Sequence, residues 1–224
     1  MELSKYKTWF FDCDGVLLDS NQLKSESFYE VALPYGKENA QALVECNKRL
    51  GGVTRFEKFR YFFETILEKK SFEKELEKAL HNFSTLVCEK LISCPETSGV
   101  RDFLSSLPTN TRKYVVSGGV QSEIQYVFKQ RGLDIYFNGI YGSPDSKEVI
   151  MGNTVRSSDI EYPAVFIGDS QYDYEIASKF NIDFIFISQY SEFIKWKSYF
   201  MDKRIKIIKS FNDLCLESEN EGLI

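Results

Sequence analysis

The sequence of 224 residues is poor in the residues on which several common catalytic and binding sites depend. It has one histidine, His81, in the middle of an expected helix, which leaves no candidate for a Ser–His–Asp triad. Its five cysteines form no Cys-x-x-Cys pair, and an odd number without regular spacing points to a reducing compartment. The 28 lysines and arginines are outnumbered by 33 aspartates and glutamates, so the net charge of −5 argues against a nucleic-acid partner.

Long apolar runs are also missing. No run approaches the length of a membrane span, so we expect no membrane partner. Asp12 and Asp14 interrupt the apolar residues near the start of the sequence, so we expect no signal peptide. These absences favour a cytoplasmic protein, and the length allows one or two domains with a substantial core.

What the sequence does have is a series of short β-type apolar runs that alternate with amphipathic segments. Such alternation is typical of βαβ units, and it predicts an α/β fold with a Rossmann-like parallel sheet flanked by helices. The expected strands cover residues 8–11, 113–116, 139–141, 164–167 and 184–187, with 205–208 as an edge strand.

One stretch, residues 21–93, breaks the alternation and contains only helical patterns. The expected helices cover residues 23–33, 38–50, 55–69 and 72–92. Thr54 is the expected N-cap of the third helix, with Glu57 completing a capping box. We therefore expect a helical cap domain over residues 20–94, inserted into an α/β core made of residues 1–19 and 95–224. The two chain crossings are expected near Ser20 and Pro95.

Two carboxylates follow the first expected strand. Side chains alternate along a strand, so Asp12 and Asp14 project to one face while Cys13 points away. Gly15 then allows a sharp turn of the backbone. The carboxyl ends of strands are where open α/β sheets bind ligands. For these two residues alone, a solvated strand end with an Asx turn is an equally good interpretation.

Other expected strands also end in polar residues. Asp169 follows residues 164–167, and Asp173 lies in the first turn of the next helix, where it could simply complement the helix dipole. Ser117 and Gly118 precede a helix that starts near Gln121, an arrangement typical of an anion-binding nest. Lys147 lies at another helix start, where the helix dipole disfavours a cation, so placement at the surface alone does not explain it. A solvated side chain remains the alternative to a functional one.

If the strands are parallel, all four loops emerge at one edge of the sheet, and Asp12, Asp14, Asp169 and Asp173 converge. Two like charges about 4 Å apart repel by roughly 4 kcal/mol at an effective dielectric constant near 20. Such a cluster calls for a cation, and an all-oxygen site beside phosphate selects Mg²⁺. The hydroxyl, the backbone donors and Lys147 suit a phosphoryl group, and a carboxylate can serve as the nucleophile.

These residues, in this order, resemble the haloacid dehalogenase superfamily, specifically its phosphatase branch with a helical cap. Residues 12–16 (DCDGV) and the LLDS that follows match the first motif of the family. Ser117 with Gly118 resembles the second motif, Lys147 the third, and residues 168–173 (GDSQYD) the fourth. The resemblance covers nearly the whole chain, including the position of the helical insertion.

The resemblance implies a phosphomonoester hydrolase that acts through an aspartyl-phosphate. Asp12 would attack phosphorus, while Asp14 would protonate the leaving oxygen and then activate water. Asp12, the main-chain carbonyl of Asp14 and Asp169 would hold Mg²⁺, with Asp173 in support. Haloacid dehalogenases proper lack the second aspartate, so Asp14 favours phosphate chemistry over dehalogenation.

The substrate side follows from the same resemblance. Ser117, the backbone of Gly118 and Lys147 would hold the phosphoryl oxygens. In phosphoglycolate-phosphatase-like members this lysine begins a Lys-Pro-x-Pro-Asp run, which is absent here and disfavours phosphoglycolate as the substrate. Caps of sugar-phosphate phosphatases offer an arginine after a glycine turn, and Arg55 after residues 51–54 (GGVT) fits that pattern. Arg55 fits equally well as a plain first-turn helix residue.

The expected substrate is a small phosphorylated metabolite, such as a sugar phosphate, handled by a monomer or weak dimer. A phosphosugar mutase of the β-phosphoglucomutase type is the first alternative, because it shares Asp12, Asp14 and the cap. Phosphoglycolate phosphatase is the second. A non-catalytic binding protein on this fold would be expected to have lost a motif residue, and none is lost here.

Overall fold

The computed structural model describes residues 3–157 and 160–220. Six parallel strands in this part of the chain form one sheet, in the order β3-β2-β1-β4-β5-β6. The strands are β1 (Thr8–Phe11), β2 (Arg112–Val120), β3 (Gly139–Ser143), β4 (Ala164–Gly168), β5 (Asp183–Ile187) and β6 (Lys206–Ile208). This confirms the expected α/β fold, with β6 at the sheet edge.

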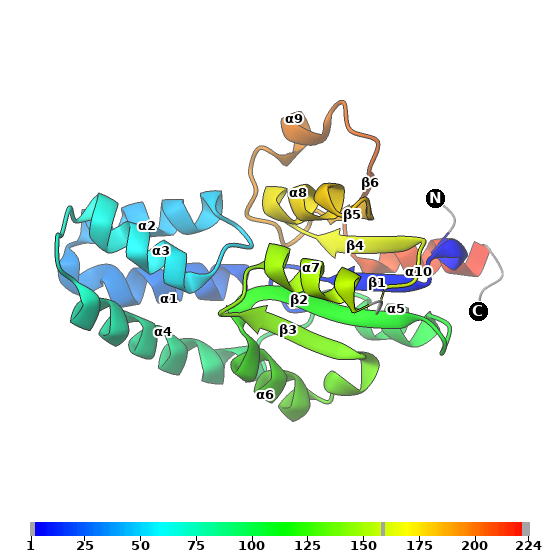
Figure 1. Ribbon diagram of the computed structural model, residues 1–224, viewed down its shortest axis with the longest axis horizontal. Coiled ribbons are helices and arrows are strands. Elements are labelled where there is room, and N and C mark those ends of the chain that lie inside the picture. Colours follow the sequence, from blue (N-terminus) through cyan, green and yellow to red (C-terminus); the bar gives the residue numbers. More distant parts are fainter. Residues whose placement is uncertain (1–2, 158–159, 221–224) are drawn as a thin grey trace.

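Helices cover both faces of the sheet (Figure 1). Two apolar clusters form, one on each face of the sheet, because side chains alternate along the strands. Trp9 and Phe11 of the central strand belong to one cluster, and Phe10 belongs to the other. On the Phe11 side lie α5 (Val100–Ser106), α6 (Gln121–Arg131) and α10 (Phe211–Asn220). On the Phe10 side lie α7 (Lys147–Arg156), α8 (Gln171–Lys179) and α9 (Trp196–Phe200). Short 3₁₀ helices lie at Leu3–Lys5, Leu33–Tyr35 and Asp134–Tyr136.

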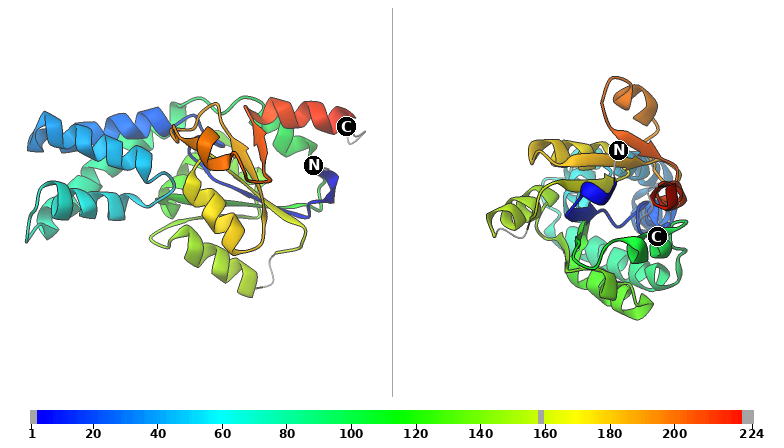
Figure 2. Two further views of the ribbon diagram at one scale, coloured as in Figure 1. Left: turned by 90° about the horizontal axis from the view of Figure 1, so that it is seen from above. Right: turned by 90° about the vertical axis from the view of Figure 1, so that its right-hand side faces the viewer.

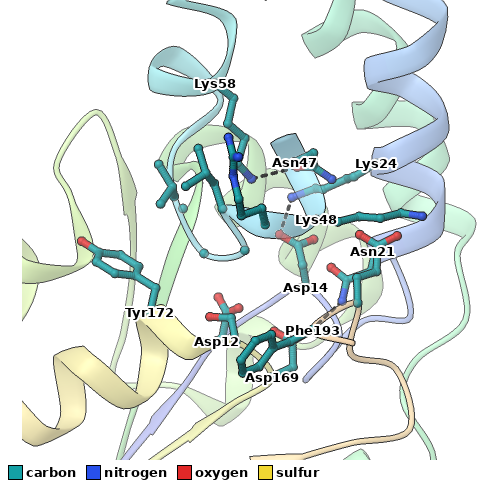
Figure 3. Close-up of a pocket in the computed structure, with 18 of the residues that line it drawn as sticks. Asp12, Asp14, Asn21, Lys24, Asn47, Lys48, Lys58, Asp169, Tyr172 and Phe193 are labelled. Carbon is teal, nitrogen blue, oxygen red and sulfur yellow. Dashed lines mark hydrogen bonds and ion pairs between the residues drawn. The ribbon is translucent and has the colours of Figure 1, made fainter. Parts of the chain in front are cut away.

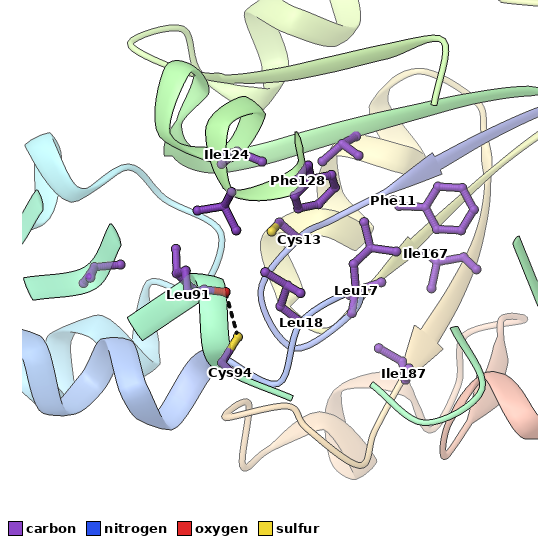
Figure 4. Close-up of a cluster of buried hydrophobic side chains, with 14 of the residues drawn as sticks. Phe11, Cys13, Leu17, Leu18, Leu91, Cys94, Ile124, Phe128, Ile167 and Ile187 are labelled. Atoms are coloured by element: carbon purple, nitrogen blue, oxygen red, sulfur yellow. Dashed lines mark hydrogen bonds between the residues drawn. The ribbon is translucent and has the colours of Figure 1, made fainter. Parts of the chain in front are cut away.

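The core continues beyond the carboxyl end of β1. Cys13 is buried among Leu17, Leu18 and Phe128 (Figure 4). The alternation that turns Cys13 into the apolar cluster leaves the carboxylate of Asp12 on the other side.

The four expected helices of the 21–93 stretch lie together at the carboxyl ends of the strands, to one side of the sheet (Figures 1 and 2). They are α1 (Asn21–Ala32), α2 (Lys37–Arg49), α3 (Arg55–Tyr61) and α4 (Glu73–Ser93), and we call them the helical segment. Thr54 caps α3 by accepting a hydrogen bond from the backbone N–H of Glu57. The third helix ends earlier than expected, since a π-helical turn, Phe62–Ile66, buries both Phe62 and Phe63.

The two connections between the helical segment and the sheet lie side by side. The backbone N–H of Asp19 donates to the carbonyl of Pro95 at 2.9 Å, and that of Thr97 donates to Leu17 at 3.2 Å. Paired connections of this kind suit a hinge, and the division into two domains near Ser20 and Pro95 stays a prediction. No helix among the described residues is both long enough and apolar enough to span a membrane.

Candidate active site

Three carboxylates meet at the carboxyl ends of the two central strands. Asp12 follows β1, Asp169 follows the adjacent β4, and Asp173 lies in the first turn of α8. One oxygen of each lies within 4.8 Å of the others, and all three side chains are buried. A Cβ on Gly168 would collide with the side chain of Asp173, so this close approach depends on glycine.

Asp173 has two functions in this arrangement. Its Oδ2 accepts hydrogen bonds from the backbone N–H and the hydroxyl of Ser170, which forms a capping box at the start of α8. Its Oδ1 accepts a bond of 2.5 Å from Lys147. The expected helix cap is therefore also part of the charged cluster.

Lys147, the first residue of α7, lies between two of the carboxylates. Its Nζ is 2.8 Å from Asp12 Oδ1 and 2.5 Å from Asp173 Oδ1, and its side chain is 0% exposed. The pKa of Lys147 is raised, because these two carboxylates outweigh the effect of burial. The solvated alternative for this residue is therefore wrong.

The cluster carries an excess of negative charge. Three carboxylates face one ammonium group, which leaves two negative charges when all are ionised. Burial is the main cause that raises the pKa of Asp12 to about 7 and that of Asp169 well above its ordinary value, and neighbouring aspartates add to both shifts. A buried, all-oxygen site with two unbalanced negative charges fits a hard divalent cation such as Mg²⁺.

Asp14 does not join this cluster with its side chain. Its carboxylate forms an ion pair with Lys24 of α1 (Figure 3). It also accepts a 2.6 Å hydrogen bond from the hydroxyl of Ser20. Burial works to raise the pKa of Asp14, but Lys24 and these hydrogen bonds lower it below its ordinary value. Of the four carboxylates expected to converge, the structure brings together three and pairs the fourth with the helical segment.

Ser117 and the two glycines after it belong to a strand rather than to the expected loop. β2 continues to Val120, and its pairing with β3 shifts register between Val116 and Val120, so the ladder skips Ser117, Gly118 and Gly119. Ser117 is fully buried, and its Oγ accepts a 3.0 Å bond from the N–H of Gly119. A bulged strand that runs directly into α6 thus replaces the expected loop.

A loop of the helical segment closes over these strand ends. A Cβ on Gly118 would lie 2.5 Å from the carbonyl oxygen of Gly52, and a Cβ on Gly52 would lie 3.4 Å from Lys147 Nζ. Gly52 has a φ of +79° and is also close to Ser170 and Tyr172 of the fourth motif. One glycine loop between α2 and α3 thus reaches the second, third and fourth expected motifs.

A cavity of about 370 Å³ lies between the sheet edge and the helical segment. Its lining includes Asp12, Asp14 and Asp169 from the sheet side, and Lys24, Arg55 and Lys58 from the helices. The carboxylates therefore face a space large enough for a small molecule, with cations on the opposite side.

The comparison with known proteins decides the family. A model of the haloacid dehalogenase-like hydrolases matches residues 9–187, which contain all four motifs. The chain belongs to the haloacid dehalogenase-like hydrolases. This confirms the family expected from the sequence.

Relatives of this hydrolase include phosphatases. The "phosphorylated carbohydrates phosphatase" of Thermotoga maritima is 27% identical over 184 residues, which cover 79% of this chain and 82% of the relative. A "predicted phosphoglycolate phosphatase" from Haemophilus somnus has a TM-score of 0.75 at 19% identity, covering 97% of this chain and 100% of the other. A β-phosphoglucomutase from Clostridium difficile has a TM-score of 0.74 at 17% identity, covering 97% of both chains. At such identities the structural likeness shows the fold alone.

Arg55 of the hydrolase lines the cavity but is already paired. Its two terminal nitrogens donate to the carboxylate of Glu123 on α6 at 3.1 and 2.6 Å. Its guanidinium also lies over the ring of Phe83, 4.8 Å from the centroid. Arg55 therefore joins the helical segment to α6.

Sequence reasoning missed the residues of α1 that contact the acidic edge. Asn21 Nδ2 donates to Asp169 Oδ2 at 2.7 Å, and Lys24 pairs with Asp14. The signal was present, because positions 21, 24 and 28 share one face of a helix that starts directly beyond the first motif.

Proposed function

We propose that this hydrolase is a Mg²⁺-dependent phosphatase of small phosphorylated metabolites that acts through an aspartyl-phosphate on Asp12. The observation that carries the proposal is the position of Asp12, a buried carboxylate 2.8 Å from Lys147 and within 4.8 Å of two more carboxylates. Its pKa near 7 leaves a large ionised fraction at neutral pH. The relative named as a phosphatase of phosphorylated carbohydrates supports a sugar phosphate or similar substrate.

Asp12, Asp169 and the main-chain carbonyl of Asp14 are the groups we propose to hold Mg²⁺, with Asp173 in support. When bound, the ion would neutralise the carboxylates and the charge that develops on the phosphoryl oxygens. Lys147 would hold a further phosphoryl oxygen, as would Ser117 and the backbone of Gly118. A positive residue beside the nucleophile offsets the repulsion between Asp12 and an anionic phosphate.

In the first proposed step, an oxygen of Asp12 bonds to phosphorus while the bond from phosphorus to the leaving oxygen breaks. Asp14 donates a proton to that oxygen, and the alcohol departs. In the second step, Asp14 takes a proton from a water molecule whose oxygen attacks the same phosphorus. The bond between phosphorus and the Asp12 oxygen breaks, inorganic phosphate leaves, and the carboxylate of Asp12 is restored.

The ion pair with Lys24 constrains Asp14 in this scheme. Lys24 favours the ionised form, which is the form that serves as base in the second step. The first step needs a proton on Asp14, so substrate binding must weaken this ion pair. Because Lys24 lies on α1, movement of the helical segment is a physical means of doing so.

We further propose that residues 20–94 form the cap that excludes water from this site, and that Arg55 contacts the substrate from the cap. The position of Arg55 in the cavity lining supports this role. Its guanidinium would then contact both Glu123 and the substrate.

Phosphate release tests the proposal directly. Sugar phosphates, nucleotides and phosphoglycolate are incubated with Mg²⁺, with EDTA, and with the Asp12→Asn variant. We expect release that needs Mg²⁺ and Asp12 and that proceeds without a bisphosphate primer. Turnover only with such a primer would instead indicate a mutase, and activity that survives exhaustive chelation would contradict the metal dependence.

A further inference from the structure

A buried lysine on the cap side of the cavity lacks a full set of partners. Lys58 of α3 is 6% exposed, lines the cavity, and donates one hydrogen bond of 2.8 Å to Asn47 Oδ1. Among the described residues, no carboxylate lies within 4.0 Å of its nitrogen. An ammonium group has three N–H donors, and a buried charge without a counter-ion is costly. The Nζ of Lys58 also lies over the ring of Phe28, 5.6 Å from the centroid, which is a weaker contact than an ion pair. Lys58 thus has N–H donors and a charge that no carboxylate among the described residues pairs with directly.

The position of Lys58 is fixed by a chain of hydrogen bonds across three elements. Asn47 Nδ2 of α2 donates to Ser25 Oγ of α1 at 2.9 Å. Ser25 in turn donates to the carboxylate of Glu192, 2.9 Å away in the loop that follows β5. This chain turns the carbonyl oxygen of Asn47 toward Lys58. The lysine is therefore held in place rather than loosely exposed to the cavity.

The charged groups around Lys58 do not neutralise it. Lys24 is nearby and is already paired with Asp14, while Glu192 is occupied by Ser25. Burial, followed by the positive charge of Lys24, lowers the pKa of Lys58 to about 8, and the smaller effects of Asp14, Cys46 and Glu192 act in the opposite direction. At neutral pH most of the molecules therefore carry an ammonium here.

Lys58 lies beyond Asp14 as seen from the acidic cluster. In Figure 3, Lys58 and Asn47 are on the cap side, Asp14 is in the middle, and Asp12 and Asp169 are at the sheet edge. All of these residues line the same cavity. With the phosphoryl group at Asp12 and the leaving oxygen at Asp14, the remainder of the leaving group extends toward Lys58.

We propose that Lys58 is a specificity-determining residue that binds a second anionic group on the leaving group of the substrate. This inference rests on the proposed phosphatase function. The substrate class is a phosphomonoester that also carries a carboxylate or a second phosphate. The buried ammonium then gains its counter-ion only when such a substrate is bound, which favours anionic over neutral leaving groups.

Matched substrate pairs separate this role from general effects. 3-Phosphoglycerate and glycerol 3-phosphate differ by a carboxylate in place of a hydroxymethyl group, and fructose 1,6-bisphosphate and fructose 6-phosphate differ by one phosphate. The variant is Lys58→Met, which keeps an unbranched side chain of similar size and removes its charge. Lys48→Met, which removes another cation from the same cavity lining, is the control.

For the preferred anionic substrate, we expect Lys58→Met to raise KM about 10- to 100-fold, the usual cost of a lost charged hydrogen bond. For the member of each pair with a neutral leaving group, KM should change by less than about twofold. Lys48→Met should change KM to the same extent for both members of a pair. Lys58→Arg, which keeps the charge, should recover part of the preference. Equal loss on both members of each pair, or no loss on either, would overturn the inference.

Binding to the Asp12→Asn protein, measured by calorimetry, keeps this test independent of turnover. We expect 3-phosphoglycerate or the bisphosphate to bind more weakly when Lys58→Met is added, with unchanged circular dichroism. If the native protein released no phosphate but this difference in binding were present, the proposed function would fail and the anion site would stand. If turnover were present without the difference, the anion site alone would be wrong.

Discussion

At the scale of single residues, each of the two aspartates of the first motif has its own lysine. Asp12 is paired with Lys147 of α7, whereas Asp14 is paired with Lys24 of the helical segment. The two pKa values move in opposite directions, because burial and the neighbouring aspartates outweigh Lys147 and raise the pKa of Asp12, whereas Lys24 and the hydrogen bonds to Asp14 outweigh burial and lower its pKa. Such separation of two neighbouring carboxylates is what distinct nucleophile and acid–base functions require.

Lys147 offers a test of the charge balance in the cluster. Lys147→Met leaves three buried carboxylates without their cation, and removing one partner from a buried charged cluster typically costs about 3–5 kcal/mol. We expect a lower melting temperature for this variant in EDTA and a larger stabilisation by Mg²⁺ than in the native protein. Asp173→Asn added to Lys147→Met should recover part of the loss. An unchanged melting temperature in EDTA would show that the carboxylates are not ionised together.

Lys58 predicts a pH dependence with a defined sign. Its pKa in the folded protein is about 8, below its ordinary value, so the ammonium is present below that pH and is lost above it. The ratio of kcat/KM for 3-phosphoglycerate to that for glycerol 3-phosphate should therefore fall as the pH rises through about 8. The ratio cancels the titration of groups that act on both substrates. A ratio that stays constant from pH 7 to 9 would contradict this expectation.

At the scale of elements, the strand ends position the site and the loop between α2 and α3 covers it. Asp12 and Asp169 meet because β1 and β4 are adjacent and parallel. Gly52 reaches Gly118 and Lys147 because it has no side chain at a φ of +79°. The loop between α2 and α3 and the strand ends therefore approach each other closely through glycines on both sides.

Gly52→Ala tests this close approach. The new Cβ would lie 3.1 Å from Ser170 Oγ and 3.2 Å from the ring of Tyr172, so we expect closure to be impaired and kcat/KM to fall about tenfold or more. Gly132→Ala is a matched control, since Gly132 has a φ of +63° with nothing within 4 Å of its Cβ position. Both variants should lose about 1–2 kcal/mol of stability from the left-handed backbone. Equal activity in both would show that the loop does not need to close.

Elements were the level at which the sequence was most informative. Alternating apolar runs predicted all six strands, and the helical pattern predicted the four helices of residues 21–93. The sequence could place Asp12, Asp169 and Lys147 together, because parallel strands end at one edge of the sheet. The hydrogen bonds that connect Lys58 through Asn47 and Ser25 to Glu192 could not be predicted, because they join residues up to 167 positions apart. Pairings of that range depend on how the helices pack, which no local pattern encodes.

At the scale of the whole molecule, several side-chain contacts around the cavity join the helical segment to the part of the chain that forms the sheet. Lys24 contacts Asp14, Asn21 contacts Asp169, and Arg55 contacts Glu123. The backbone connections at residues 19 and 95 are paired with each other, which suits rotation about a common hinge. Closure of the cap and completion of the site are therefore expected to be one event.

Arg55→Ala tests whether the helical segment contributes to specificity through this residue. If Arg55 contacts the substrate, KM for the best substrate should rise while KM for p-nitrophenyl phosphate changes little. Glu123→Gln, which weakens the ion pair but keeps Arg55, is the control for its structural function. Equal loss on both substrates would make Arg55 structural, and no loss on either would place specificity elsewhere in the helical segment.

The central claim is that Asp12 forms a covalent phosphoenzyme. The most direct measurement is rapid acid quenching of the native protein with a ³²P-labelled substrate and Mg²⁺, followed by hydroxylamine treatment and mass spectrometry. We predict an acid-stable label that hydroxylamine removes, a hydroxamate at residue 12, and no label in Asp12→Asn. A label that resists hydroxylamine, a hydroxamate at another residue, or full turnover by Asp12→Asn would contradict the account.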